Sequence, residues 1–178
     1  MSNALVKMTL DEARPIATDV MDALFPYCER IEIAGSFRRG RKHIGDIEVV
    51  CIPRTIEIQA DLFETQLVRS PGFVQTVLRW EKVKGDPENG KYTQRIHPSG
   101  TKIDIFMPTP ENWGIILLIR TGPAAYSKSI MTQLKQKGYR CEGGYVKNSK
   151  TGYVVPTYSE NCVYKLLGQK PVLPFARL

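Results

Sequence analysis

The chain has 178 residues, of which 42% are hydrophobic and 24% charged, as in an ordinary soluble globular protein of one unit or two small lobes. No apolar run approaches the ~18 residues of a membrane-spanning helix, and residues 1–10 lack a secretory signal pattern, so we expect a cytoplasmic protein without membrane association. The four cysteines show no Cys-x-x-Cys spacing. The absence of this spacing argues against a disulfide scaffold and against a zinc site.

The charge is unevenly distributed along the chain. In total, 25 Lys and Arg oppose 18 Asp and Glu, a net charge of +7. Residues 111–178 hold ten basic and three acidic groups, so this segment alone carries a difference of +7. A basic C-terminal segment favours a polyanionic partner such as nucleic acid. The alternative is a lysine-rich surface kept for solubility.

The first elements in chain order are three helices that alternate with two strands. Thr9 and Glu12 have the spacing of a capping box, and the apolar residues that follow predict a helix over 10–26, with Pro15 as an alternative start. Further elements are expected in this order: a strand over 31–34, a brief helix after 35–36, a strand over 46–52 and a helix over 56–68.

From Val77 onward the sequence alternates as β-strands do, with turns expected at 86–90 and 98–100 and a strand over 102–107. Residues 108–110 are the expected linker. Beyond it the sequence predicts helices over 111–119 and 123–137, a hairpin around 143–144 and a last helix over 159–167.

Two predicted strands carry acidic residues in an unusual pattern. Asp46 and Glu48 are two residues apart, so their side chains project from the same side of a strand and repel each other. Asp104 stands in a second strand between apolar neighbours. If these strands pair, three carboxylates converge, which is enough to hold two Mg²⁺ ions for an in-line phosphoryl displacement.

The turn before these strands supplies groups suited to phosphate. Gly35 allows close backbone approach, and Ser36 near a helix N-terminus offers a hydroxyl and free N–H groups. Arg38 and Arg39 follow, and at least one is expected to clamp a triphosphate. Each feature alone is more often a helix cap, a solvated arginine pair or an exposed edge strand, so the prediction depends on their order and spacing together.

Four motifs together resemble the DNA polymerase beta-like X family of the nucleotidyltransferase superfamily: Gly-Ser-Phe-Arg-Arg-Gly at 35–40, Gly-Asp-Ile-Glu at 45–48, Lys-Ile-Asp-Ile-Phe at 102–106 and Thr-Gly at 121–122. The resemblance implies an α+β fold: a catalytic palm over 1–110, a mixed β-sheet with helices on one face, followed by a small basic α+β thumb over 111–178. It implies no lyase or helix-hairpin-helix domain, as in the minimal viral member of the family.

The resemblance also implies roles for individual residues. The metal ligands and catalytic carboxylates would be Asp46, Glu48 and Asp104, holding two Mg²⁺ ions, with Mn²⁺ as an alternative. The incoming nucleotide would contact Gly35, Ser36, Arg39, Gly45, Thr121 and Gly122. The DNA phosphates would face Lys128, Lys135 and Lys147, although solvated lysines remain the alternative.

The implied activity is addition of dNMP from a dNTP to a primer 3′-hydroxyl in gap filling or repair. The partners would be a DNA primer-template and dNTPs, the protein would be a monomer, and a viral or prophage origin stays open. The alternatives are a non-templated nucleotidyltransferase acting on a 3′-end, a small molecule or a protein, and an inactive nucleic-acid-binding relic. The sequence departs from the family at Glu48, Ile119, Arg120, Ser127 and Met131. These departures make template fidelity and ribose discrimination the weakest parts of the resemblance.

The remaining histidines and aromatic residues are expected in structural roles. His43 is expected in an exposed loop and His97 in a turn. Trp80 and Trp113 are expected in the core rather than stacked on bases. The cysteines are expected to be free buried thiols.

Overall fold

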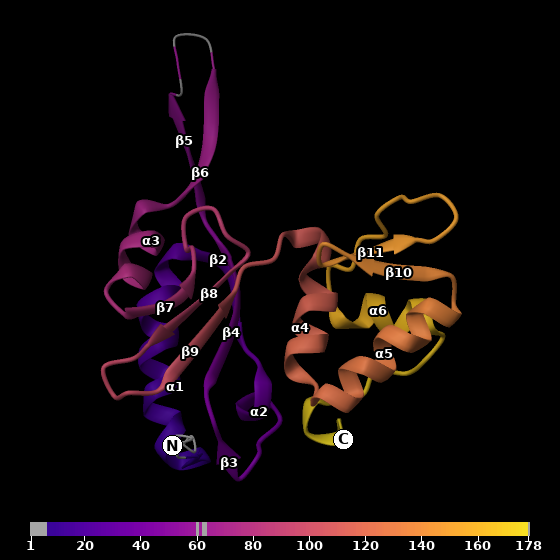
Figure 1. The fold of residues 1–178 in the computed structure, drawn as a ribbon, viewed down its shortest axis with the longest axis horizontal. Helices are drawn as coiled ribbons and strands as arrows, with labels where there is room; N and C mark the ends of the chain where they lie inside the picture. Colours follow the sequence, from indigo (N-terminus) through magenta and orange to yellow (C-terminus); the bar gives the residue numbers. More distant parts are fainter. Residues whose placement is uncertain (1–6, 60, 62–63, 178) are drawn as a thin grey trace.

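The computed structural model describes residues 7–59, 61 and 64–177. Figure 1 shows an N-terminal lobe built on a β-sheet and a C-terminal lobe built on helices, joined by the segment that leads into α4. Each lobe has its own hydrophobic cluster, and a third cluster lies where the two lobes meet. The architecture is α+β, as the sequence predicts.

The N-terminal lobe contains a five-stranded sheet with the order β2-β4-β9-β8-β7. The strands β4 and β9 are parallel, and every other neighbouring pair is antiparallel, so the sheet is mixed, as predicted. The strands are β2 (Cys28–Ile33), β4 (Ile47–Pro53), β7 (Glu81–Gly85), β8 (Tyr92–Ile96) and β9 (Lys102–Phe106).

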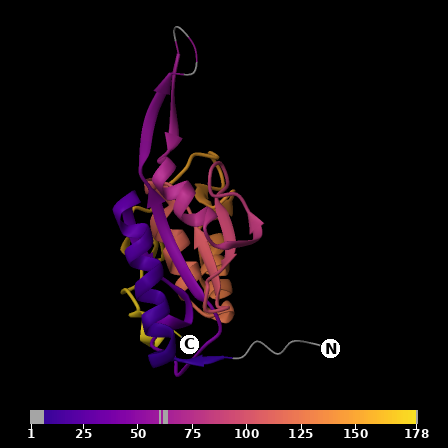
Figure 2. The ribbon, with the colours of Figure 1, turned by 90° about the vertical axis from the view of Figure 1, so that its left-hand side faces the viewer.

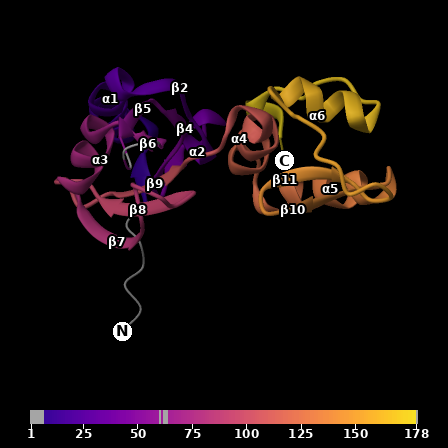
Figure 3. The same cartoon turned by 90° about the horizontal axis from the view of Figure 1, so that it is seen from above.

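Two helices, α1 (Leu10–Leu24) and α3 (Pro71–Leu78), cover one face of this sheet (Figures 2 and 3). Alternate strand residues such as Val49 and Ile105 are fully buried beneath them. Because side chains alternate between faces along a strand, the residues between them project from the opposite face. That face meets the C-terminal lobe through Val50 and Phe106.

The start of α1 follows the predicted capping box. Thr9 Oγ1 accepts a hydrogen bond from the Glu12 backbone N–H at 3.3 Å, and the Glu12 carboxylate accepts one from the Thr9 N–H at 2.7 Å. Pro15 therefore lies inside the helix instead of starting it. It is exposed, so water can solvate the backbone carbonyl that the proline leaves without an N–H partner.

The helix predicted over 56–68 is wrong for the described residues, which exclude 60, 62 and 63. Strands β5 (Thr55–Gln59) and β6 (Thr65–Arg69) instead form an antiparallel hairpin that projects from the lobe as an arm (Figure 1). Ile56 lies opposite Val68, which brings two β-branched side chains together. A helix here would have needed a core for its apolar face, whereas β-branched residues favour a two-stranded ribbon.

The strand predicted from Val77 onward is also wrong at its start, because α3 continues through Leu78 and β7 begins at Glu81. The downstream elements are confirmed, with bounds shifted by a few residues. They are η2 (Pro110–Asn112), α4 (Trp113–Thr121), α5 (Ala124–Gln136), β10 (Tyr139–Glu142), β11 (Tyr145–Asn148) and α6 (Glu160–Leu167). The short elements are β1 (Met8–Thr9), η1 (Phe25–Tyr27), α2 (Gly35–Arg38), β3 (His43–Ile44) and η3 (Pro174–Ala176).

The predicted core tryptophans, Trp80 and Trp113, are both buried. His43 is exposed, but in β3 instead of a loop. His97 does more than occupy a turn, because it is buried and its Nε2 lies 2.7 Å from Asp19 Oδ2 on α1. The turn after β8 is thereby tied to the helix layer.

The four cysteines, all of which are described, are free thiols, as expected. Cys28 and Cys51 are buried, whereas Cys141 and Cys162 are only half-buried. Within the described residues, no helix combines the length and the apolar character needed to cross a lipid bilayer.

Candidate functional site

The register between β4 and β9 sets the predicted carboxylates side by side. Glu48 is the direct partner of Asp104 across the two parallel strands. Both residues belong to the sheet face opposite α1, because the buried Val49 and Ile105 follow them on the other face. Asp46 precedes β4 by one residue. The pairing that the sequence analysis required for the three carboxylates is therefore present.

The electrostatics of this region confirm that the three carboxyl groups influence one another. Burial and then the charges of Asp46 and Asp104 raise the pKa of Glu48 to about 7, against the opposing effect of Arg120 and Arg39. Burial, and then the charge of Asp104, also raises the pKa of Asp46. The repulsion among these groups is only partly compensated by nearby arginines.

Gly35 is shaped by its contact with Glu48. Its φ is +62°, in the left-handed region that glycine adopts without strain, and a Cβ there would overlap the Glu48 carboxylate. The first turn of α2 can therefore lie directly against this acidic side chain only because residue 35 is glycine.

The carboxylate of Asp104 is held from the neighbouring strand β8. Its Oδ1 accepts a hydrogen bond from Gln94 Nε2 at 2.9 Å and another from the Tyr92 hydroxyl. As the side chains stand, no group of three or more histidine, cysteine, aspartate or glutamate residues in the described part of the chain is arranged to hold a metal ion. The carboxylates are close enough to repel, but their oxygens do not converge on one point.

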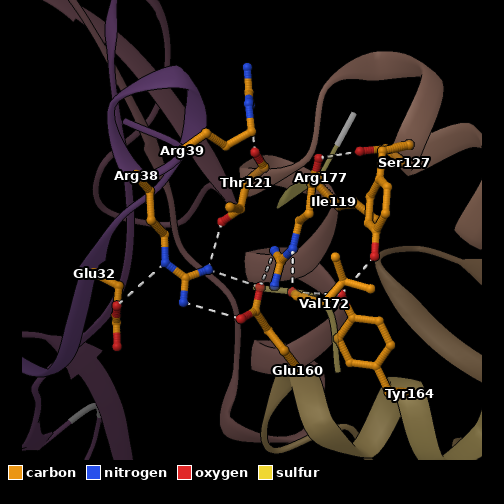
Figure 4. A network of polar contacts seen from close by, with 11 residues as sticks. Glu32, Arg38, Arg39, Ile119, Thr121, Ser127, Glu160, Tyr164, Val172 and Arg177 are labelled. Carbon is orange, nitrogen blue, oxygen red and sulfur yellow. Dashed lines mark hydrogen bonds and ion pairs between the residues drawn. The ribbon is translucent and has the colours of Figure 1, made fainter. Parts of the chain in front are cut away.

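The two arginines after Ser36 have different partners. Arg38 turns toward the C-terminal lobe, where its Nη1 donates to Thr121 Oγ1 and to Glu160 Oε1, both at 2.9 Å (Figure 4). A second hydrogen bond, from Nη2 to Glu160 Oε2 at 3.1 Å, makes the pair bidentate. Arg38 is therefore part of the junction between the lobes and is occupied by protein groups.

Glu160 is the centre of this junction. Arg177 Nη1 donates to the same Oε1 at 2.7 Å, so two guanidinium groups surround one carboxylate (Figure 4). Burial acts to raise the pKa of Glu160, but the hydrogen bonds from Arg177 and Arg38 outweigh it and lower the pKa. We call the set of Arg38, Thr121, Glu160 and Arg177 the junction network.

Arg39 faces the candidate site more directly. Its Nη1 donates to the Thr121 carbonyl oxygen, while its Nε is buried without a hydrogen-bond partner among the described residues. Burial lowers the pKa of Arg39. An unsatisfied donor on a partly desolvated cation is suited to an anionic ligand.

Two cavities meet at Glu48 and Arg120, because these two side chains line both of them. The first cavity, of about 630 Å³, lies along β8 and β9. Its lining includes Lys84, Lys91, Tyr92, Gln94, Asp104 and Asn112. The second cavity, of about 520 Å³, lies between α2 and the start of α5. Its lining includes Ser36, Arg39, Asp46, Gly122, Ser127 and Lys128.

The remaining predicted residues are distributed around these cavities. Thr121 is fully buried at the end of α4, and its side-chain and backbone oxygens accept from Arg38 and Arg39. Gly45 is half-buried in the bend before Asp46. Of the predicted DNA-facing lysines, Lys128 lines the second cavity and Lys135 is exposed on α5. Lys147 lies 3.4 Å from Glu142 in an ion pair.

Sequence reasoning missed two groups of residues. Tyr92 and Gln94 have the two-residue spacing of one strand face, a signal that points to Asp104 only once β8 is placed beside β9. Glu160 gave no local signal, because its partner Arg38 lies 122 residues earlier in the chain.

Comparison with known proteins finds partial similarity to a DNA polymerase. No family model matches the chain. DNA polymerase lambda of Rattus norvegicus is 28% identical over 149 residues, a stretch that covers 75% of this chain and 26% of that protein. The chain thus matches about a quarter of this relative. The similarity supports a relationship to the X-family polymerases.

Proposed function

We propose that this protein is a nucleotidyltransferase that adds dNMP from a dNTP to a primer 3′-hydroxyl on DNA, in gap-filling or repair synthesis. The observation that carries the proposal is the register between β4 and β9, which pairs Glu48 with Asp104. Glu48 lines both cavities, and Asp104 lines the first. The partial similarity to DNA polymerase lambda supports the same class of reaction. In these terms the N-terminal lobe is the palm and the C-terminal lobe the thumb.

The chemistry of the donor set fits a divalent metal. Asp46, Glu48 and Asp104 offer hard oxygen ligands. Burial and the charges of neighbouring carboxylates raise the pKa values of Asp46 and Glu48, and a bound cation would offset both effects. These three residues would hold two Mg²⁺ ions, or Mn²⁺, once their carboxylates turn toward a common point. Such ions stabilise the attacking and leaving oxygens of a phosphoryl transfer.

The second cavity is the proposed site of the triphosphate. Ser36 and Arg39 line it beside Asp46, so a hydroxyl and a guanidinium group are available to phosphate oxygens. Gly35 and Gly45 flank the same acidic strand, and Gly122 closes the cavity from the thumb side. Thr121 contributes by orienting Arg39 through its carbonyl oxygen instead of touching the sugar.

The proposed role of Asp104 is to accept the proton of the primer 3′-hydroxyl. The DNA would lie along the first cavity, where Lys84 and Lys91 add positive charge beside the carboxylates. On the thumb, Lys128 and Lys135 are exposed and would contact DNA phosphates. Lys147 would contribute less, because Glu142 already pairs with it.

The test is primer extension on gapped and on single-stranded DNA, with each dNTP alone and with all four. We expect Asp104→Asn to lower nucleotide addition by more than about a thousandfold, because it removes a metal ligand and the proton acceptor together. Asp22→Asn, which alters an exposed aspartate of α1, is the matched control and is expected to keep full activity. Asp104→Asn with activity within about tenfold of the unaltered protein would contradict the proposal.

A non-templated nucleotidyltransferase is the second candidate. The observation that favours it is the hydrogen bond from Ser127 Oγ to the Ile119 carbonyl oxygen at 2.7 Å, which takes up the hydroxyl that faces the second cavity. A hydroxyl that donates its hydrogen in this way has no donor left for an acceptor atom of a base edge. Extension with a single dNTP that ignores the template would support this candidate, whereas the unaltered protein's failure to extend any primer would favour the inactive relic.

A further inference from the structure

We infer that Tyr92 and Gln94 are positioning residues that fix the orientation of the Asp104 carboxylate by occupying one of its two oxygens. This inference rests on the proposed function and assigns a role to two residues of β8 that neither the motifs nor the comparison identifies. It concerns how Asp104 is held, and neither residue is expected to touch the nucleotide.

The antiparallel register of β8 and β9 places both donors. Gln94 is the direct partner of Asp104, and Tyr92 is the partner of Phe106. Because Tyr92 and Gln94 are two residues apart, both side chains project from the sheet face that carries Asp104. Their two hydrogen bonds end on the same atom, Oδ1.

The two carboxylate oxygens of Asp104 differ in their hydrogen-bond partners. An ionised carboxylate accepts hydrogen bonds at both oxygens, with about two sites on each. Oδ1 already accepts two, whereas no hydrogen bond to Oδ2 is found from any described residue. Rotation of an aspartate carboxylate is otherwise only loosely restricted. The two donors therefore keep Oδ2 directed away from protein partners and open to a metal ion or a primer hydroxyl.

Tyr92 is itself held in place by its neighbours. Its ring stacks on Phe106 with 4.9 Å between centroids, and Lys84 Nζ lies 5.4 Å from the same ring. The guanidinium of Arg120, from α4 of the other lobe, lies 4.0 Å from the Phe106 centroid. The Tyr92 hydroxyl is thus fixed by packing from both lobes, as a positioning group needs to be.

The test uses Tyr92→Phe, Gln94→Leu and the double variant, in single-turnover nucleotide addition. Each single variant leaves one donor on Oδ1, so we expect the rate at saturating dNTP to fall only about fivefold. The double variant releases the carboxylate, so we expect a loss of about a hundredfold, larger than the product of the two single losses. The apparent dissociation constant for dNTP is expected to stay within about twofold, because neither residue lines the second cavity.

A second measurement does not require turnover. Binding of Mn²⁺ alone, followed by electron paramagnetic resonance of the free ion, is expected to weaken about fivefold in the double variant. The matched control is Thr93→Val, which lies between the two residues on the same strand. Thr93 is fully buried on the other face, and its Oγ1 donates to the Lys84 carbonyl oxygen at 3.0 Å. This change is expected to lower stability without altering the rate or Mn²⁺ binding.

The inference is overturned if the double variant binds Mn²⁺ and adds nucleotide as the unaltered protein does. It is also overturned if Thr93→Val reproduces the losses, because the role of the pair would then be only to stabilise the sheet. Failure of the proposed function has a different signature: the unaltered protein would extend no primer. In that case the Mn²⁺ measurement still decides whether Tyr92 and Gln94 order Asp104.

Discussion

Glu48 and Glu160 are two partly buried glutamates near the meeting of the lobes, and their pKa values shift in opposite directions. Burial and two neighbouring carboxylates raise the pKa of Glu48 to about 7. Burial also disfavours the charge of Glu160, but Arg177 and Arg38 donate to its oxygens and lower its pKa. The negative charge of Glu48 is therefore only partly compensated by protein groups, whereas that of Glu160 is compensated by two arginines.

The difference separates a binding region from a structural one. The protein itself supplies the cations that Glu160 requires, and the junction network has no need of a ligand. At the carboxylates around Glu48, the nearby arginines compensate the charge only in part. A cluster of carboxylates whose charge the protein does not fully compensate is a candidate for binding an external cation or for catalysis.

The largest expected effect is on activity. Glu48→Gln should lower nucleotide addition by more than about a hundredfold, because a carboxamide is a poor ligand for a hard divalent cation. Glu160→Gln should lower it by less than about tenfold, because Glu160 lines neither cavity. Single-turnover primer extension at low temperature, where both variants stay folded, compares them. Similar losses in the two variants would mean that the comparison does not separate binding from structure.

The next largest effect is on stability, where Glu160→Gln is expected to lose more than Glu48→Gln. Glu160 has a side chain only 14% exposed and bonds to two guanidinium groups, so Glu160→Gln should lower the free energy of unfolding by about 3 kcal/mol. Glu48→Gln removes a repelling charge, so it should raise stability at about pH 7 and leave it unchanged at about pH 5, where folded Glu48 is protonated. Urea unfolding of both variants without metal measures the difference. A Glu48→Gln protein as unstable as Glu160→Gln would contradict the assignment.

The pH dependence of stability sharpens the same comparison. The pKa of Glu48 is raised from 4.5 to about 7 on folding, so the folded chain keeps a proton that the unfolded chain loses. Stability should therefore fall as pH rises through this window, by about 3 kcal/mol at most. In Glu48→Gln this fall should be smaller. Unfolding in EDTA at about pH 5 and about pH 7.5 tests this, and equal slopes in both proteins would contradict it.

The smallest expected effects concern the thumb lysines. Lys128→Ala should weaken DNA binding and reduce the slope of log K against log salt by about 0.9, the value for one lost phosphate contact on duplex. Lys147→Ala should change the slope less, because Lys147 is already paired with Glu142. Fluorescence anisotropy over a series of salt concentrations measures both slopes. A larger change for Lys147 than for Lys128 would place the DNA on a different surface.

The sequence predicts the parts of the site that depend on local periodicity. Asp46 and Glu48 are two residues apart, and this spacing together with the apolar neighbours of Asp104 predicts two acidic strands. Their pairing is only a condition of that prediction, and the register between β4 and β9 supplies it. Gly35 is similarly predictable as a close approach, although its partner, the Glu48 carboxylate, is not. Local patterns are informative here because strand geometry determines which side chains share a face.

The errors arise where tertiary context decides. The apolar spacing from Ile56 to Val68 fits a helix, but the segment extends from the body of the lobe, so no core is available for a helical face. Arg38, predicted as a possible phosphate clamp, is instead paired with Glu160. No local pattern indicates a partner so far along the chain, and both outcomes depend on how the lobes dock.

The long separation of Arg38 and Glu160 has a consequence for folding during synthesis. The sheet of the N-terminal lobe can assemble once Phe106 has left the ribosome, but the junction network is complete only when Arg177 follows. At about 5–20 residues per second, the intervening residues take roughly 4–14 s to synthesise. During that interval Val50 and Phe106, which the docked C-terminal lobe covers, are exposed on the nascent chain. Slow synthesis of the second lobe would therefore favour chaperone binding or aggregation at this sheet face.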